Sequence, residues 1–237
     1  PKELVTYIPH AIDTKEMFTD VGQAGRKQMG IPEDAHLTVM NAANRGRLPI
    51  RKAFAENLLA LSNFMKRHPD AWAYIHTEPE GISDGMNLVR YLKFIDAPLD
   101  RFRWPEPMAF RNGIPTENLR HIYSAADVLL ATSMGEGFGV PTIEAQACGT
   151  PVVATAVGGL RTAVADGISG VLVDGHDPRA WSSVLARLLQ EPQRRVLLSM
   201  GAIEHASHFG WDATARGTLD IYDQVITEAA RAAKSIG

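Results

Sequence analysis

Short apolar runs alternate along the chain with longer stretches whose apolar residues recur at helical spacing. Such alternation is typical of a parallel sheet whose strands are joined by helices on both faces. The expected strands are Leu37–Ala43, Trp72–Thr77, Phe102–Trp104, Asp127–Thr132, Pro151–Thr155 and Gly170–Asp174. The expected helices are 15–29, 51–68, 84–95, 116–126, 141–148, 159–166 and 178–190. The pattern therefore predicts an α/β fold, a Rossmann-like doubly wound parallel sheet.

Two regions fall outside this alternation. Residues 1–13 are expected to form an extended interdomain linker segment with no strand to pair with, ahead of a Rossmann-like domain over 14–192. Residues 193–237 carry long helical patterns interrupted near Phe209, with Asp212 as the expected N-cap of the last helix. These C-terminal helices need a surface on which to pack, either this domain or a further one.

Composition narrows the class of protein. The 237 residues are 45% hydrophobic and 22% charged, which is typical of a globular domain with one core. A net charge of -3 gives no general attraction for polyanions, so we expect no nucleic-acid partner. The apolar runs are too short for a transmembrane segment. The single cysteine, Cys148, and the absence of a secretory leader favour a cytoplasmic protein.

A glycine-rich turn carries the strongest chemical signal. The segment SMGEGFGVPTIEAQACG, 133–149, follows an apolar strand and opens a helix at Pro141. Its glycines at 135, 137 and 139 allow close backbone approach, and the helix start aims free N–H groups at the loop, which favours an anion. That helix end contributes about 0.3–1 kcal/mol, so a diphosphate also needs basic partners. The alternatives are a plain turn or a dinucleotide fingerprint, but Val140 occupies the third glycine position of such a fingerprint.

Two carboxylates flank the start of this helix. Glu136 lies in the loop and Glu144 eight residues later, in the first turns. Carboxylates only accept hydrogen bonds, so beside a phosphate site they suit paired hydroxyls such as a ribose diol or a sugar ring. The loop therefore predicts a nucleotide-sugar site. The alternative is that Glu136 merely caps the following turn.

A basic run lies where the first expected strand leads into a helix. The segment NRGRLPIRK, 44–52, holds four cations, Arg45, Arg47, Arg51 and Lys52. They either form a solvated charged surface or neutralise the negative charge that develops on a departing nucleoside diphosphate. We expect Arg51 to face outward.

The segment EGFGVPTIE, from Glu136 to Glu144, resembles the E-x7-E motif of retaining GT-B glycosyltransferases, family 4 (group 1). The resemblance extends through HIYSAADVLLATSMGEGFG, EAQACGTPVVATAVGG, DGISGVLVDGHDP and the FGW at 209–211. The opening IPHAID is similar to the linker that follows the N-terminal domain of that family. At Arg161 and Thr162 the chain departs from the Pro-Glu that the family has after its glycine pair.

This resemblance implies two Rossmann-like domains facing a cleft, of which the chain is the C-terminal, donor-binding one. It implies a retaining glycosyltransferase of the hexosyltransferase type that moves a sugar from a nucleoside-diphosphate sugar to an unidentified acceptor. The isolated domain is expected to be inactive without an N-terminal half, which would hold the acceptor and any peripheral membrane contact. The alternatives are a GT-B-like sugar-nucleotide epimerase and a non-catalytic nucleotide-sugar-binding module. We expect no cofactor and no metal, since no Asp-x-Asp triplet occurs.

The resemblance also implies roles for individual residues. Arg47 and Lys52 match the arginine-lysine pair of the family, with Arg45 as the rival for the arginine, and Glu136 completes the expected catalytic set. Trp104 and Pro105 lie where the family contacts the nucleobase, and the alternative is that Trp104 is a core residue. The expected nucleotide-binding residues are Gly137, Phe138, Gly139, Val140, Thr142, Glu144, Trp104 and Pro105.

Overall fold

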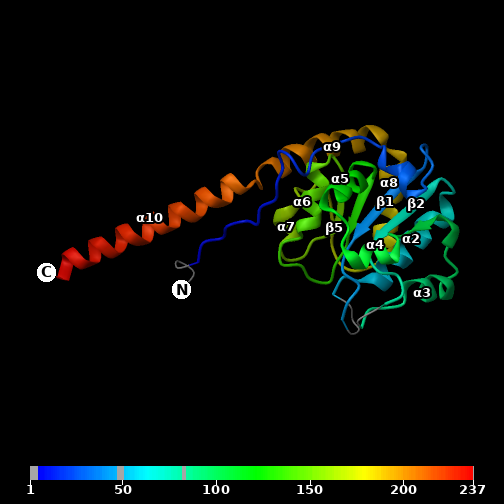
Figure 1. The fold of residues 1–237 in the computed structure, drawn as a ribbon, viewed down its shortest axis with the longest axis horizontal. Coiled ribbons are helices and arrows are strands. Elements are labelled where there is room, and N and C mark those ends of the chain that lie inside the picture. Colours follow the sequence, from blue (N-terminus) through cyan, green and yellow to red (C-terminus); the bar gives the residue numbers. More distant parts are fainter. Residues whose placement is uncertain (1–4, 47–50, 82–83, 237) are drawn as a thin grey trace.

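The computed structural model describes residues 5–46, 51–81 and 84–236, with side chains as far as residue 231. Its centre is a six-stranded parallel sheet in the order β3-β2-β1-β4-β5-β6, with helices on both faces (Figure 1). The strands are β1 His36–Asn41, β2 Ala71–His76, β3 Phe102–Arg103, β4 Val128–Ala131, β5 Val152–Thr155 and β6 Gly170–Val173. The predicted α/β fold with a doubly wound parallel sheet is confirmed.

Helices cover the sheet in two layers. They are α1 Gly25–Met29, α2 Phe54–Arg67, α3 Leu88–Phe94, α4 Pro107–Asn112, α5 Thr116–Ser124, α6 Val140–Ala147, α7 Leu160–Ala163, α8 Pro178–Gln190, α9 Pro192–Ser207 and α10 Trp211–Ile236. A short 3-10 turn, η2 Leu99–Arg101, precedes β3. Alternate strand residues enter two buried clusters: Leu37 and Val39 pack with α5, α6 and α7, whereas Met40 and Ile75 pack with α2, α3 and α8. Burial of both faces explains why the strands read as continuous apolar runs.

The strand order reverses beside β1. This strand pairs with β2 on one side and with β4 on the other, so the chain winds outward in opposite directions from that point. In open α/β sheets, ligands bind at the carboxyl ends of the strands where the order reverses. Asn41 at the end of β1 and the residues from Thr132 onward, after β4, therefore lie at the expected ligand edge.

Several expected helices are shorter in the structure than the sequence pattern predicts, three of them by a large fraction of their length. The first expected helix, 15–29, is helical only in α1, because the Asp13 carboxylate accepts the N–H groups of Lys15 and Glu16 and so forms a turn. The third, 84–95, begins at Leu88, where Asn87 caps α3. The sixth, 159–166, is reduced to α7. Local side-chain hydrogen bonds compete with the helix at the first site and fix its start at the second.

The entry segment has a partner that the sequence did not predict. Ile12 forms a parallel bridge with Gly210, and its N–H donates to the carbonyl of Phe209 at 2.9 Å. The expectation that nothing pairs with this segment was therefore wrong. Asp212 is not an N-cap either: it is the second residue of α10, and its carboxylate accepts a hydrogen bond from Lys15 at 2.7 Å.

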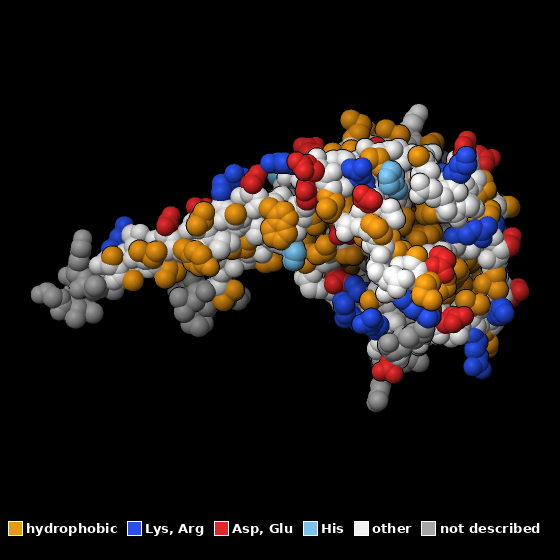
Figure 2. Space-filling model, viewed as in Figure 1, with side chains coloured by type: hydrophobic (Ala, Val, Ile, Leu, Met, Phe, Trp, Pro, Cys, Tyr) orange, Lys and Arg blue, Asp and Glu red, His pale blue; other side chains and the backbone are white. Residues whose placement is uncertain are grey.

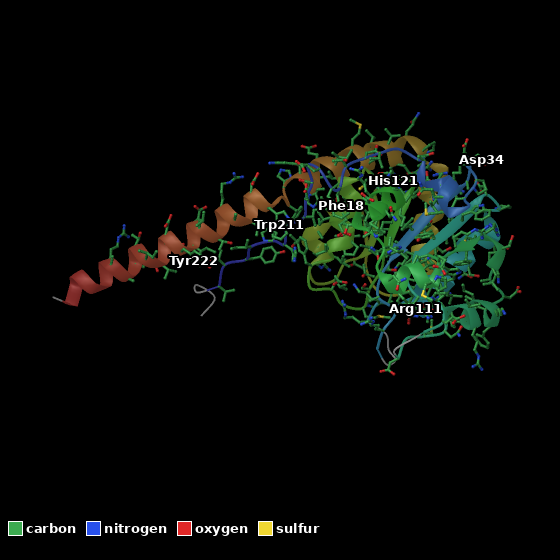
Figure 3. The ribbon with its side chains drawn as sticks, in the orientation of Figure 1. Phe18, Asp34, Arg111, His121, Trp211 and Tyr222 are labelled. Atoms are coloured by element: carbon green, nitrogen blue, oxygen red, sulfur yellow. The ribbon has the colours of Figure 1, made fainter. Side chains whose placement is uncertain are left out.

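The two C-terminal helices differ in their surroundings. Helix α9 buries Leu198, Ala202 and Ala206 against the globular part, whereas α10 leaves it and runs outward for 26 residues (Figure 1). Hydrophobic side chains line α10 outside the globular part (Figure 2), among them Tyr222, whereas Trp211 stands where the helix departs (Figure 3). Within the described residues, no helix combines the length and hydropathy that a bilayer span requires. The predicted divisions at 1–13, 14–192 and 193–237 stay predictions.

Candidate functional site

The glycine-rich loop ends in a fixed turn ahead of α6. Gly139 has a φ of 93°, a left-handed conformation that favours glycine, and Pro141 stands in the first helical turn as predicted. The Thr142 hydroxyl donates to the carbonyl of Gly139 at 2.6 Å. Gly135 and Gly137 have no neighbours within 4 Å of where a Cβ would lie, so these two positions are open. The loop is thus fixed at its helical end and open in its middle.

A second loop supports the backbone of Glu136. The N–H of Gly159, after β5, donates to the carbonyl of Glu136 at 2.9 Å. A Cβ at Gly159 would lie 2.1 Å from the carbonyl oxygen of Gly137, so only glycine allows this approach. The two backbones therefore pack directly together, which holds the Glu136 carbonyl in place.

Two cations meet the Glu136 carboxylate. Lys52 Nζ contacts its Oε2, and Arg51 Nη1 lies 3.2 Å from its Oε1 while also donating to the Gly135 carbonyl at 2.9 Å. Arg51 is exposed, as predicted, but its guanidinium also turns back to the loop, which the sequence did not predict. Within the described part of the chain, the carboxylate accepts no backbone N–H. The turn-capping alternative for Glu136 therefore finds no support there.

The environment keeps Glu136 charged. Burial by itself raises the pKa of this carboxyl, but the hydrogen bond and charge of Lys52, followed by those of Arg51, bring the pKa below its ordinary value. The Glu136 and Lys52 side chains are 13% and 17% exposed, whereas Arg51 is 59% exposed. The pair is therefore an ionised, partly sheltered contact with one solvent-facing cation beside it.

The start of α2 is tied to the end of β4. The buried Asn57 amide donates to the carbonyls of Lys52, Ala53 and Thr132, at 3.0, 2.8 and 2.7 Å. Ala53 has a φ of 47°, a conformation that non-glycine residues adopt at a cost, and it directly follows Lys52. These hydrogen bonds of Asn57, called the Asn57 clasp below, fix the backbone position of Lys52 relative to the loop after β4.

Glu144 lies in α6, in the first helical turns as expected, and its carboxylate meets a buried phenol. Tyr123 Oη donates to Glu144 Oε2 at 2.8 Å, and Asn41 Nδ2 donates to Tyr123 Oη at 2.7 Å. Burial raises the pKa of Glu144, and it raises that of Tyr123 well above its ordinary value. A small cleft over the sheet edge is lined by Asn41, Lys52, Glu136, Gly139, Pro141 and Thr142, among others.

Trp104 packs on a core residue and, with Pro105, borders a cleft, while the nucleobase contact of both residues stays a prediction. The Trp104 ring stacks on Phe102, with centroids 6.2 Å apart and 17° between planes, so one face is core packing. Both residues also line a cleft of about 510 Å³ together with Tyr74 and His121. The tryptophan is thus a packed residue that borders an open cleft.

Phe138 packs against the entry segment, whereas Arg45 of the basic run borders a second cleft. The Phe138 ring stacks on His10 at 6.0 Å and contacts Phe209 at 5.6 Å, which joins the loop to the entry segment. Arg47 lies outside the described residues. Arg45 is exposed and lines a second cleft, of about 410 Å³, with Glu78 and Arg111 among others. The choice between Arg45 and Arg47 as the phosphate arginine stays open.

Sequence reasoning did not single out Tyr123 or Asn41. Tyr123 stands inside the HIYSAAD segment that carries the resemblance, and that was its only signal. Among the described residues, no three His, Cys, Asp or Glu side chains are grouped as a metal ion would require. The expectation of a metal-independent reaction stays a prediction.

Comparison with known sequences places this site in context. Residues 105–205 match the profile of the family described as "Glycosyl transferases group 1". The chain is 36% identical over 231 residues to a D-inositol 3-phosphate glycosyltransferase of Thermobispora bispora, covering 98% of this chain and 53% of that protein. It is 40% identical over 204 residues to the enzyme of the same name from Streptosporangium roseum, covering 84% and 45%. The chain thus spans about half the length of the curated relatives it matches.

Solved structures share the fold. Sucrose-phosphate synthase from Thermosynechococcus elongatus superposes with a TM-score of 0.74 at 30% identity, covering 93% of this chain and 52% of that one. Anabaena HepE in complex with UDP gives 0.77 at 18% identity, covering 94% and 58%. Such structural neighbours are GT-B glycosyltransferases, and the chain shares the architecture of one of their Rossmann-like domains.

Proposed function

We propose that this chain, which carries a glycosyl transferase group 1 domain, binds the nucleoside-diphosphate sugar of a retaining glycosyltransferase and presents it to an acceptor that is still unidentified. The observation that carries the proposal is the meeting of Lys52 and Glu136 at the edge where the strand order reverses. The names of the relatives and the UDP in the HepE complex support a nucleotide-sugar ligand.

The cations act on the leaving group. As the glycosidic bond breaks, negative charge grows on the diphosphate, and a cation fixed beside it stabilises the transition state more than the ground state. Lys52 is held by the Asn57 clasp and would exchange its contact with Glu136 for the diphosphate. Arg47 is proposed as its partner on the grounds of the sequence motif, with Arg45 as the rival.

The carboxylates act on hydroxyls. Once Lys52 turns to the diphosphate, Glu136 is an ionised acceptor that binds and orients the donor sugar, aided by the N–H groups of Gly137–Gly139. Glu144 accepts from the ribose hydroxyls. In the proposed retaining course the acceptor attacks the face that the diphosphate leaves, so no enzyme carboxylate bonds covalently to the sugar. Val140 and Thr142 shape the turn, and Trp104 and Pro105 border the nucleobase.

The test measures binding by the chain itself. A panel of UDP, GDP and ADP sugars is screened by thermal shift, since a ligand at 100 times its Kd stabilises the folded state by about 2.7 kcal/mol. Calorimetry then compares the best sugar nucleotide with its free nucleoside diphosphate. Glu136→Ala is expected to weaken the sugar nucleotide about tenfold more than the free diphosphate, because a lost hydrogen bond to a charged group is worth about 1.5–3 kcal/mol.

The control is Glu204→Ala, which removes an exposed carboxylate on α9 and is expected to change neither affinity. Three outcomes contradict the proposal. The first is that no member of the panel stabilises the chain. The second is that Glu136→Ala weakens both ligands equally, and the third is that mass spectrometry of the enzyme during turnover detects a sugar attached to Glu136.

A further inference from the structure

Tyr123 is completely buried, yet it is hydrogen-bonded to a residue of the proposed nucleotide site. Its side chain comes from α5, has no exposed surface, and places its hydroxyl between Glu144 of α6 and Asn41 at the end of β1. A phenol this deep in the core needs partners for its hydroxyl, but a backbone carbonyl would satisfy that need. Here both partners are side chains, and Asn41 also lines the small cleft at the sheet edge.

The direction of the two hydrogen bonds is dictated by chemistry. An ionised carboxylate can only accept, so the single proton of the Tyr123 hydroxyl points to Glu144 Oε2. The oxygen of that hydroxyl is then free to accept, and the Asn41 amide supplies the donor from its Nδ2. Each group in the series Asn41–Tyr123–Glu144 therefore has one compatible orientation, which makes the series a rigid support.

The support leaves one oxygen of Glu144 available. Oε2 is occupied by Tyr123, and within the described residues Oε1 accepts no hydrogen bond and no cation lies within 4 Å of either oxygen. Glu136 differs, because Lys52 and Arg51 occupy both of its oxygens. Glu144 thus offers a defined, unneutralised acceptor, which suits neutral hydroxyls rather than a charged group.

We propose that Tyr123, oriented by Asn41, is a positioning residue that fixes which oxygen of Glu144 faces a bound nucleotide, so that preference for a ribose with free hydroxyls depends on a buried phenol that does not touch the ligand. This inference rests on the proposed function, because it takes Glu144 as the ribose acceptor. Without the Tyr123 hydroxyl the carboxylate can rotate, and its hydrogen bonds to the ribose lose their alignment.

The experiment compares two ligands on a set of variants of the 237-residue chain. Calorimetry measures Kd for UDP and for 2′,3′-dideoxy-UDP, and the ADP and GDP pairs are measured in the same way. Tyr123→Phe removes one oxygen and is expected to weaken UDP about fivefold while changing the dideoxy ligand less than twofold, since the lost contact acts only through the ribose hydroxyls. Asn41→Ala is expected to shift the same ratio in the same direction by less.

Two further variants complete the set. Glu144→Gln removes the charged acceptor directly, so it gives the largest change expected in the ratio of the two Kd values. Tyr91→Phe is the matched control: Tyr91 is a half-buried tyrosine of α3 whose hydroxyl makes no hydrogen bond to the described residues, so neither Kd is expected to change. Asn41→Ala keeps the test independent of how well Tyr123→Phe folds.

The outcomes separate the two ideas. If Glu144→Gln lowers the preference for UDP over the dideoxy ligand but Tyr123→Phe and Asn41→Ala leave it unchanged, the positioning role is wrong and the proposed function stands. Equal weakening of both ligands by Tyr123→Phe also overturns the positioning role, because the hydroxyl then only maintains the fold. If the unaltered chain binds none of the three diphosphates, or Glu144→Gln has no effect, the proposed function fails first.

Discussion

The two edges of the sheet both hold a cation beside a carboxylate, but in different surroundings. At the amino end of the strands, Arg26 Nη2 lies 2.8 Å from Asp127 Oδ2, with side chains 3% and 17% exposed. Arg26 also donates to the carbonyls of Ala125 and Glu33, and Asp127 accepts the N–H of Leu37. At the carboxyl end, Glu136 meets Lys52 and the solvent-facing Arg51.

The two sites differ in how many N–H donors of the cation form hydrogen bonds to other groups of the protein. The Arg26 guanidinium is bonded on several sides by backbone and carboxylate, so it is a fixed part of the fold. Lys52 has one side-chain contact among the described residues, and that contact borders a cleft. A buried pair is costly to break, whereas a contact at a cleft can be exchanged for a ligand. The same chemistry therefore supports stability at one edge and is available for the proposed binding at the other.

Asp127→Ala is expected to have the largest effect on stability. Removing this carboxylate leaves the buried Arg26 charge without its partner, which lowers the free energy of unfolding by about 3–5 kcal/mol. Urea denaturation measures it, with Glu136→Ala as the counterpart at the other edge. That variant is expected to cost less, because its cation Lys52 borders a cleft and can turn to water, whereas Arg26 is 3% exposed. Equal losses for the two variants would remove the distinction between the edges.

Lys52→Ala is expected to act on turnover and not on folding. In an enzyme that contains this chain, kcat should fall roughly 10²–10³-fold, as for other lost donors to a developing charge. The same loss is expected for Arg47→Ala. Lys93→Ala, at an exposed position of α3, is the control. Steady-state kinetics decides the matter, and an unchanged kcat in Lys52→Ala rejects the assignment.

His36 makes the amino edge sensitive to acid. Burial, opposed by Asp127, lowers the pKa of this imidazole from 6.5 to about 4. Between these values the unfolded chain binds a proton that the folded chain excludes, so the free energy of unfolding falls as the pH drops from 6.5 towards 4. The loss from His36 reaches about 3 kcal/mol at pH 4.

Replacing His36 by Leu should therefore make the free energy of unfolding depend less on pH between pH 6.5 and pH 4. Burial lowers the pKa of His76, at the carboxyl end of β2, to about 4 and also lowers that of His205, so part of the acid sensitivity is expected to remain. Urea midpoints at pH 7 and pH 4.5 give the comparison. If the urea midpoint falls by the same amount between pH 7 and pH 4.5 in both proteins, His36 does not cause the acid sensitivity.

Arg51→Ala is expected to give the smallest effect. Its exposed guanidinium contributes at most about 1 kcal/mol to a contact, so the affinity for a nucleoside diphosphate should fall no more than about fivefold. The effect should also shrink in 0.5 M salt, because exposed charges are screened. Calorimetry at two salt concentrations measures it. If Arg51→Ala lowered the affinity for the nucleoside diphosphate as much as Lys52→Ala does in the same calorimetric assay, Arg51 would be the principal cation.

Local pattern predicted the sheet well because the central strands β1, β4 and β5 are buried almost throughout and are rich in apolar residues. In β1, Leu37 and Val39 face one cluster and Met40 the other, and even the polar Thr38 between them is completely buried. The expected helix over 15–29 failed since periodicity does not register a competing turn, here formed by the Asp13 side chain. Pattern alone therefore located the strands better than the helix boundaries.

The site was harder to predict because its geometry depends on contacts between distant segments. Lys52 reaches Glu136 and Arg51 reaches Gly135, each across 84 residues, and the left-handed Ala53 follows them directly. Nothing in the basic run indicates that turn. Tyr123 was missed since its partner Asn41 is 82 residues away. Sequence reasoning identified the residue types of the site, and the fold determined which of them meet.

Cys148, at the end of the helix that carries Glu144, offers a way to follow this site in time. It is 1% exposed, and burial raises the pKa of its thiol to about 12, so the folded chain presents almost no thiolate to an alkylating reagent. Labelling must await a local opening of α6, and its rate then reports the fraction of molecules in which that helix is open. Because the described residues contain no second cysteine, labelling of Cys148 alone records how often α6 opens, and a ligand bound at the proposed nucleotide site should slow that labelling.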